Sequence, residues 1–205
     1  MFYTAHIPNW FMKLNPSLVW KLPAENKTLY LTFDDGPHET ATPFILDELK
    51  KYNAKATFFC IGKNVKALPN LYKRVLDEGH AVGNHTFNHL NGWKTKNKNY
   101  ITDIQQAAGY IDSKLFRPPY GKISPFVAKL IIKAGYKIIM WHVLSGDFDE
   151  NLSPQKCTEN VLLYSKPGSI IVFHDSTKAW QRMSYALPKI LNHFTNEGFL
   201  FKKLL

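Results

Sequence analysis

The chain has 205 residues, of which 45% are hydrophobic and 20% are charged, as is usual for a globular protein with its own hydrophobic core. Its 26 Lys and Arg against 16 Asp and Glu give a formal net charge of +10, which favours anionic surroundings but specifies no function. The 2 cysteines exclude a disulfide-rich scaffold, and we expect neither a membrane-spanning segment nor a cleavable export signal in the sequence as given.

Strand-like and helix-like segments alternate along the chain. Apolar runs predict strands at 28–33, 55–62, 80–84, 115–117, 136–143, 168–174 and 198–204. Amphipathic segments predict helices at 42–52, 69–79, 100–115, 124–135 and 185–197. Such repeated strand–helix units predict an α/β fold with a parallel sheet and outer helices, and about seven strands suit a closed or nearly closed, distorted (β/α) barrel.

The chain shows no linker or repeat that would separate it into two large domains. We expect the barrel domain over 28–205 and an N-terminal extension, residues 1–27, packed on it. The extension contains several aromatic residues, namely Phe2, Trp10, Phe11 and Trp20. An interfacial anchor is one interpretation, but Pro8 and Pro16 interrupt any long amphipathic helix, so we expect these aromatic side chains to cover part of the core.

Two histidines in the segment GNHTFNH, His85 and His89, stand four residues apart. On a helical turn this spacing places both imidazoles on one face, close enough to bind one metal ion. The H-E-x-x-H pattern of zinc proteases has Glu after its first histidine, whereas this chain has Thr86. A third ligand and a base must therefore come from elsewhere, unless the two are ordinary, partly buried histidines.

Other polar residues also follow the ends of predicted strands, namely Asp34, Asp35, Arg117, Asp147 and His174. In a parallel α/β barrel these strand ends share the face on which active sites are built. The side chains of Asp34 and Asp35 diverge because the residues are adjacent at a strand end. One carboxylate can therefore bind a metal with the histidines while the other accepts a proton, although a plain Asp-Asp-Gly turn is the alternative.

Five motifs occur in the order found in polysaccharide deacetylases: TFDDG (32–36), HTFNH (85–89), RPPYG (117–121), SGDFD (145–149) and VFH (172–174). The chain resembles that family, carbohydrate esterase family 4, whose shared unit is the NodB-homology domain. The resemblance covers roughly residues 28–203. It implies a distorted barrel, a divalent metal ion and hydrolysis of N-acetyl groups on amino sugars.

The resemblance also implies a role for each matching residue. The metal ligands would be Asp35, His85 and His89. The catalytic set would be the base Asp34, the acid His174, and their supports Arg117 and Asp147. Oxyanion and substrate contacts would come from Tyr120, through its backbone N–H, and from Trp141, Phe148 and Val172. A purely structural ion pair is the alternative for Arg117.

The chain departs from the family pattern around the substrate pocket. Phe148 stands where the family usually has Trp, which removes an indole N–H donor. Val172 replaces the more common Leu, and His142 and Leu144 stand where acidic residues are often found. These changes leave the choice of sugar open but leave the metal ligands intact.

We therefore expect a metal-dependent hydrolase that removes N-acetyl groups from an amino-sugar glycan, such as peptidoglycan or a chitin oligomer. A hydrolase of a non-sugar amide and an inactive carbohydrate-binding module are the alternatives. Zn²⁺ suits a His/His/Asp site, with Co²⁺, Ni²⁺ or Mn²⁺ as other candidates. We expect a monomer without a nucleic-acid partner, and both a cytoplasmic location and a peripheral association with the membrane or cell envelope stay open.

Overall fold

The computed structural model describes residues 3–23 and 26–205, so Phe2 lies outside the described residues. The strands are β1 (Thr28–Asp34), β2 (Thr57–Cys60), β3 (Ala81–Asn84), β4 (Leu115–Phe116), β5 (Lys137–Ile138), β6 (Val143–Leu144), β7 (Ile170–His174) and β8 (Leu200–Phe201). The helices are α1 (Asn9–Lys13), α2 (Ala41–Lys51), α3 (Gly62–Ala67), α4 (Pro69–Asp77), α5 (Asn97–Ala108), α6 (Pro125–Lys133), α7 (Pro154–Tyr164) and α8 (Trp180–Asn196), with a 3-10 turn at Pro119–Gly121.

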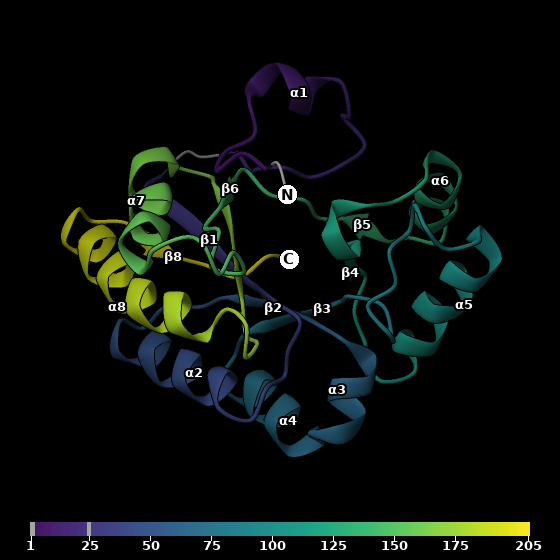
Figure 1. Cartoon of the computed structure of the whole chain (residues 1–205), viewed down its shortest axis with the longest axis horizontal. Coiled ribbons are helices and arrows are strands. Elements are labelled where there is room, and N and C mark those ends of the chain that lie inside the picture. The colour runs from purple at the N-terminus through teal and green to yellow at the C-terminus, as the bar shows by residue number, and fades with distance from the viewer. Residues whose placement is uncertain (1–2, 24–25) are drawn as a thin grey trace.

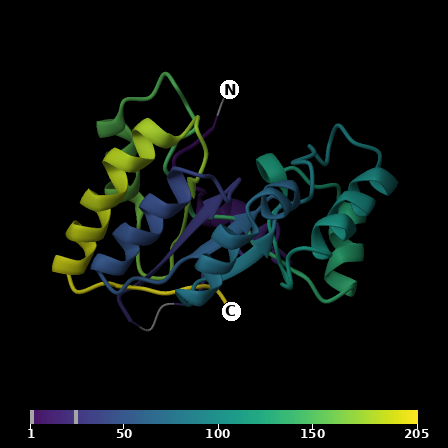
Figure 2. The ribbon, with the colours of Figure 1, turned by 90° about the horizontal axis from the view of Figure 1, so that it is seen from below.

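The strands form one parallel sheet in the order β5-β4-β3-β2-β1-β7-β6, and the short β8 pairs with β1. Helices surround the curled sheet: α2, α7 and α8 lie on one side, α3 and α4 below, and α5 and α6 on the other side (Figure 1). Figure 2 shows the C-terminal residues running along the lower edge of the molecule. The predicted α/β fold with about seven parallel barrel strands is confirmed.

The core is built from the apolar runs that predicted the strands. Leu29, Leu31 and Phe33 of β1 are fully buried, and Phe33 stacks with Phe58 of β2 and Phe173 of β7. Because outer helices cover a parallel sheet, its strands are apolar almost continuously instead of alternating with polar residues. The charged side chains of the central strands therefore stand at the strand ends, as Asp34 and His174 do.

The N-terminal residues bridge the two edges of the sheet. β5 and β6 are consecutive in the chain, yet they stand at opposite ends of the strand order. On the β5 side, the N–H of Val19 donates to the carbonyl of Ile138 at 2.9 Å, and on the β6 side the N–H of Leu144 donates to the carbonyl of Ala5 at 2.8 Å. The described part of the extension therefore covers the gap in the barrel wall.

The single strand predicted at 136–143 is wrong. The structure has two short strands, β5 and β6, because the intervening residues cross from one edge of the sheet to the other. The apolar run was continuous because residues along the crossing, such as Ile139 and Met140, are also buried. Apolar sequence indicates burial here, and it does not distinguish one strand from two.

Several helices also differ from the prediction. α5 begins at Asn97 and ends at Ala108, before Gly109, instead of spanning 100–115. α8 begins at Trp180 instead of Tyr185 and contains Pro188 in its interior. Three helices, α1, α3 and α7, were not predicted. Glycine favours a helix end, whereas packing against the barrel maintains the helix around Pro188.

Aromatic residues of the extension fall into two groups. Trp20 is 7% exposed and belongs to the core beneath α5 and α6, as predicted. Trp10 and Phe11 of α1 are 65% and 39% exposed, so the expectation that they cover the core is wrong for Trp10. No helix in residues 3–23 and 26–205 combines the length and apolarity needed to cross a bilayer.

Candidate active site

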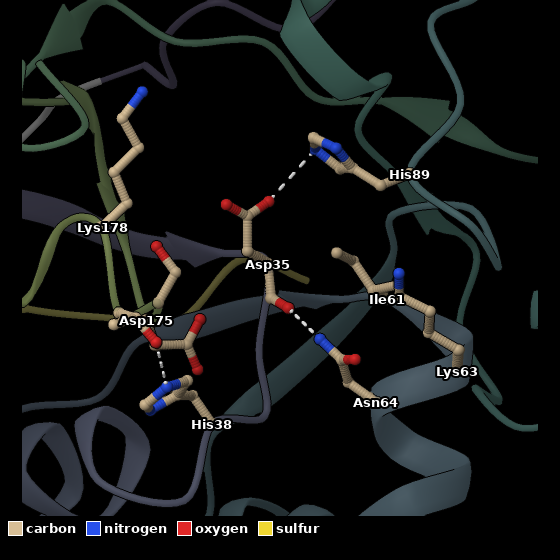
Figure 3. A pocket seen from close by; sticks show the side chains of 10 residues that line it. Asp35, His38, Ile61, Lys63, Asn64, His89, Asp175 and Lys178 are labelled. Atoms are coloured by element: carbon tan, nitrogen blue, oxygen red, sulfur yellow. Dashed lines mark hydrogen bonds and ion pairs between the residues drawn. The ribbon is translucent and has the colours of Figure 1, made fainter.

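The predicted polar residues converge where β1, β3 and β7 end. A cleft of about 390 Å³ opens there, lined in part by Asp35, His89 and Asp175. Figure 3 shows the carboxylate of Asp35 facing the ring of His89 across the centre of this cleft. On the neighbouring strands, Asp34 of β1 stands in register with His174 of β7.

Asp35, His85 and His89 point to a common centre. One ligand atom from each lies within 4.8 Å of the others. Asp35 Oδ1 is 3.1 Å from His89 Nε2 and 3.7 Å from His85 Nε2. The helical turn considered for this histidine pair is wrong, because both residues lie in an irregular loop after β3, where Thr86 and His89 have φ angles of 64° and 58°.

A buried carboxylate holds this loop in place. Asp103 of α5 accepts hydrogen bonds from the backbone N–H groups of Phe87 and Asn88, each at 2.9 Å, and from the Asn88 side chain at 2.6 Å. Asp103 was not predicted as a site residue from the sequence. Its signal was an acidic residue between Tyr100 and Ile104 on the buried face of a helix, where an acid needs a partner.

The donor set fits a cation. His85 Nδ1 lies 2.7 Å from the carbonyl of Arg117, which can only accept, so Nδ1 carries the proton and Nε2 presents its lone pair. Burial lowers the pKa of His85 to about 4, which keeps the ring neutral at pH 7. The contact between Asp35 Oδ1 and His89 lacks hydrogen-bond geometry, so this buried oxygen has no donor.

The Asp35 side chain is ionised. Burial alone would raise the pKa of its carboxyl, but His89 and the neighbouring His174 hold this pKa well below its usual value. The Asp35 carboxylate and the Nε2 lone pair of His85, 3.7 Å apart, repel each other unless a positive charge lies between them. A divalent cation with nitrogen and oxygen ligands supplies that charge.

Asp34 is paired with a fully buried arginine. Arg117 donates from one guanidinium nitrogen to Asp34 Oδ1 and to Thr32 Oγ1, both at 2.7 Å. Its remaining donors bind the carbonyls of Ile139 and Met140, at 3.2 and 2.8 Å. Each of the three guanidinium nitrogens thus donates to at least one acceptor, and no described side chain binds the second carboxylate oxygen of Asp34.

His174 is paired with a fully buried aspartate. Asp147 Oδ1 lies 2.7 Å from His174 Nδ1, and Asp147 Oδ2 accepts the backbone N–H of His174 at 2.7 Å. Burial alone would lower the pKa of His174, but the Asp147 carboxylate outweighs this effect and the pKa rises to about 10. The imidazole therefore holds a proton through neutral pH.

The predicted oxyanion and substrate residues differ in their solvent exposure and in their contacts. Tyr120 is 50% exposed, has a positive φ of 59°, and lies with its ring centroid 4.7 Å from that of His89. Phe148 packs edge-on against His174 at 5.4 Å. Trp141 lies against Gly121, where an added Cβ would come within 2.7 Å of the indole. Val172 is only 1% exposed, so its place in a substrate pocket stays a prediction.

Two further buried groups support the site and were not identified as such from the sequence. Arg182 of α8 donates to the carbonyl of Asp147 at 2.6 Å. Asp175, next to His174, accepts the N–H of Gly36 at 2.8 Å and the hydroxyl of Thr42 at 2.6 Å. Gly36 has no room for a side chain, because a Cβ would lie 1.8 Å from the Asp175 carboxylate.

A parallel half-barrel with two histidines beside a carboxylate, an Arg-paired aspartate and an Asp-paired histidine at its strand ends defines a metal-dependent hydrolase. Residues 21–139 match the family model described as polysaccharide deacetylase. The chain belongs to the polysaccharide deacetylase family and is a deacetylase-type hydrolase.

Relatives of known name cover most of the chain. A peptidoglycan-N-acetylglucosamine deacetylase of Bacillus cereus is 36% identical over 190 residues, which span 90% of this chain and 89% of that protein. A peptidoglycan-N-acetylmuramic acid deacetylase of Bacillus subtilis is 33% identical over 190 residues, spanning 88% of this chain and 71% of that protein. The crystal structure of a peptidoglycan N-acetylglucosamine deacetylase superposes with a TM-score of 0.85 at 35% identity, covering 95% of this chain and 94% of that one.

Proposed function

We propose that this protein removes acetyl groups from the N-acetylated amino sugars of a peptidoglycan-type glycan. The observation that carries the proposal is the register of Asp34 and His174 on adjacent strands, beside the cluster of Asp35, His85 and His89. A base and an acid therefore stand next to a cation site. The names of the relatives, which act on peptidoglycan amino sugars, support this choice of substrate.

Asp35, His85 and His89 would hold the cation. Zn²⁺ suits two nitrogens and one oxygen with open positions, and Co²⁺, Ni²⁺ and Mn²⁺ also accept such ligands. When bound, a divalent cation lowers the pKa of water and polarises the acetyl carbonyl. The hydrogen bond from His85 Nδ1 to the carbonyl of Arg117 fixes the ring so that Nε2 faces the site.

Asp34 acts as the base through its second carboxylate oxygen. Arg117 occupies Oδ1 and fixes the orientation of the carboxylate, so Oδ2 accepts the proton of the attacking water. Because the guanidinium is buried and anchored by two backbone carbonyls, it cannot turn away with the carboxylate. Arg117 is therefore a positioning residue, and the backbone N–H of Tyr120 is the proposed donor to the oxyanion.

His174 acts as the acid. Its Nδ1–H is held by Asp147, so the proton on Nε2 is available to the departing amine of the sugar. A raised pKa keeps this proton in place until the carbon–nitrogen bond breaks. Phe148 and Trp141 would form the apolar walls beside the acetyl group, and Val172 would lie beneath it.

We further propose the catalytic unit over 28–205 with residues 1–27 as a supporting extension. The hydrogen bond that Val19 donates to Ile138 and the one that Ala5 accepts from Leu144 join the extension to the two edges of the sheet and support this division. We propose that the protein works as a monomer. We also propose that it associates peripherally with the cell envelope, because its net charge of +10 favours an acidic polymer or membrane surface.

Asp34→Asn tests the assignment of the base. Loss of the accepting carboxylate is expected to reduce acetate release from peptidoglycan and from an N-acetylglucosamine tetramer by at least about a hundredfold. The amide oxygen still accepts from Arg117, so the variant should fold and bind Zn²⁺ like the wild type. The measurements are acetate release, calorimetric titration with Zn²⁺ and thermal unfolding.

Full activity of the folded Asp34→Asn variant would exclude Asp34 as the base. Turnover of small cyclic amides, with no acetate released from either glycan by the wild type, would instead favour a non-sugar amide hydrolase. Binding of glycan with no hydrolysis at any metal loading would favour a carbohydrate-binding module.

A further inference from the structure

An indole ring stands exposed beside the site without a role in the chemistry. Trp93 follows His89 by four residues and is 66% exposed. Burial of a side chain of this size is strongly favourable. An exposed tryptophan therefore either finds no room in the core or is available to bind a partner. The contacts around Trp93 separate these two cases.

The side chain of Trp93 is held in one orientation by its neighbours. Its indole Nε1 donates to the carbonyl of Ile123 at 3.1 Å, and its backbone N–H donates to the side chain of Asn91 at 3.0 Å. Lys122 places its ammonium 3.9 Å from the ring centroid, on one face of the indole. The hydrogen bond and the lysine orient the ring, and the exposed fraction shows that much of its surface still meets solvent.

The backbone of this loop is also packed tightly against residues 120–123. Gly92 is buried, and an added Cβ would lie 2.4 Å from the carbonyl oxygen of Lys122. Two residues before Lys122, the ring of Tyr120 packs on His89 at 4.7 Å. The indole is therefore connected through one short, rigid segment to a proposed metal ligand, and it keeps a set position relative to the cleft.

Trp10 shows what an exposed tryptophan without such contacts looks like. It is 65% exposed, almost the same fraction as Trp93. Among the described residues, no hydrogen bond to the Trp10 indole is found, and its ring meets only Phe11, at 5.8 Å. Trp10 lies on α1, at the margin of the ribbon away from α5, which follows the Trp93 loop (Figure 1).

A fixed aromatic face beside a cleft suits one kind of ligand. Pyranose rings present faces of C–H groups that pack on aromatic rings, while their hydroxyls remain in water. A preset ring loses little conformational entropy when the sugar binds. Trp93 does not line the cleft itself, but its loop packs on residues 120–123, and Tyr120 of that segment packs on His89. A ring on the His89 side, outside the cluster that would react, suits a neighbour of the sugar that is deacetylated.

We propose that Trp93, held by Lys122 and Ile123, is a subsite that stacks on a sugar ring adjacent to the reacting residue of the glycan. The proposal rests on the proposed function for the position of the reacting sugar. It makes the protein an enzyme for chains of at least two sugar residues, with affinity that rises as the chain extends over the Trp93 loop.

The test compares Trp93→Ala with Trp10→Ala. Binding of an N-acetylglucosamine tetramer and of the monomer to the metal-free protein is measured by titration calorimetry. Loss of the Trp93 ring is expected to weaken tetramer binding about tenfold and to lower the tetramer-to-monomer ratio of kcat/KM by a similar factor, mainly through KM. Trp10→Ala should leave both quantities as in the wild type.

Trp93→Tyr provides a second variant. It keeps an aromatic face but loses the donor to Ile123, so partial recovery of tetramer binding is expected relative to Trp93→Ala. Unchanged tetramer affinity in a folded Trp93→Ala variant overturns the subsite. Tetramer binding that depends on Trp93 in a protein that releases no acetate overturns the proposed function and leaves the subsite standing.

Discussion

His174 and Asp34 each reach the cleft with a buried partner of opposite charge. Asp147 and Arg117 are both fully buried, and their partners are at most partly exposed. A buried charge that loses its partner is strongly destabilising, so each pair maintains its own geometry. In the second pair, the Asp147 carboxylate also favours the protonated form of His174.

Replacing Asp147 by Asn is expected to move the alkaline limit of activity to lower pH. Asp147 raises the pKa of His174 to about 10, so the acid form persists well above neutral pH. Without the negative charge, burial lowers this pKa, and the protonated fraction at pH 8 falls. We expect kcat/KM at pH 8 to drop about a hundredfold.

The measurement is the pH profile of kcat/KM for wild type and Asp147→Asn, with acetate as the product. The loss should be smaller at pH 6 than at pH 8, because more of the imidazole is protonated in acid. An equal loss at every pH would mean that Asp147 only shapes the loop and does not set the protonation of His174.

Among the elements, helix α5 determines whether the histidine loop has its shape. Asp103 gathers three donors from residues 87 and 88, and Asn84, at the end of β3, accepts the N–H of Thr86 at 2.8 Å. The loop contains two non-glycine residues with positive φ, a conformation that is maintained only when surrounding contacts compensate its strain. The arrangement of Asp35, His85 and His89 therefore depends on α5 as much as on β3.

Asp103→Ala should therefore weaken Zn²⁺ binding. Removing the acceptor leaves two partly buried backbone donors without their partner and frees the segment that carries His89. We expect metal affinity to fall about tenfold to a hundredfold and the free energy of unfolding to fall by about 1–3 kcal/mol.

The matched control is Asp112→Ala, because Asp112 follows the same helix but is exposed. Calorimetric titration with Zn²⁺ and denaturant unfolding measure the two effects. If Asp103→Ala binds Zn²⁺ as tightly as the control does, the loop keeps its shape without the carboxylate.

For the molecule as a whole, net charge influences its association with a polymeric substrate. The net charge is +10. Two lysines of the loop that carries Trp93, Lys94 and Lys96, and Lys98 in the first turn of α5 are exposed, and in the described part of the chain none of them forms an ion pair. A positive surface raises the local concentration of an anionic glycan and speeds its association.

Salt should accordingly reduce activity on an acidic polymer more than on a neutral oligomer. Between about 0.05 and 0.5 M salt, screening shortens the range of the positive field to a few ångströms. We expect kcat/KM for peptidoglycan to fall several-fold over this range and that for the neutral N-acetylglucosamine tetramer to change little. Equal responses of the two substrates would show that surface charge has no part in substrate association.

The sequence by itself determined which residue types were available and in what order. Asp34, Asp35, Arg117, Asp147 and His174 could be placed at strand ends because apolar runs mark buried parallel strands, and parallel strands end on a common face. The family motifs predicted that His85 and His89 lie together with Asp35, although the helical turn assumed from their spacing is absent. Such local patterns can be read from the sequence because they depend on burial and on neighbouring residues in the chain.

Tertiary structure alone decided the rest. Only folding brought the Asp103 carboxylate from α5 to the histidine loop, and only the crossing between sheet edges divided the apolar run at 136–143 into β5 and β6. The same holds for Trp93, whose fixed orientation depends on Lys122 and Ile123, about 30 residues away. Contacts between distant residues carry no local pattern, because burial and hydrogen bonding are satisfied in space and not along the chain.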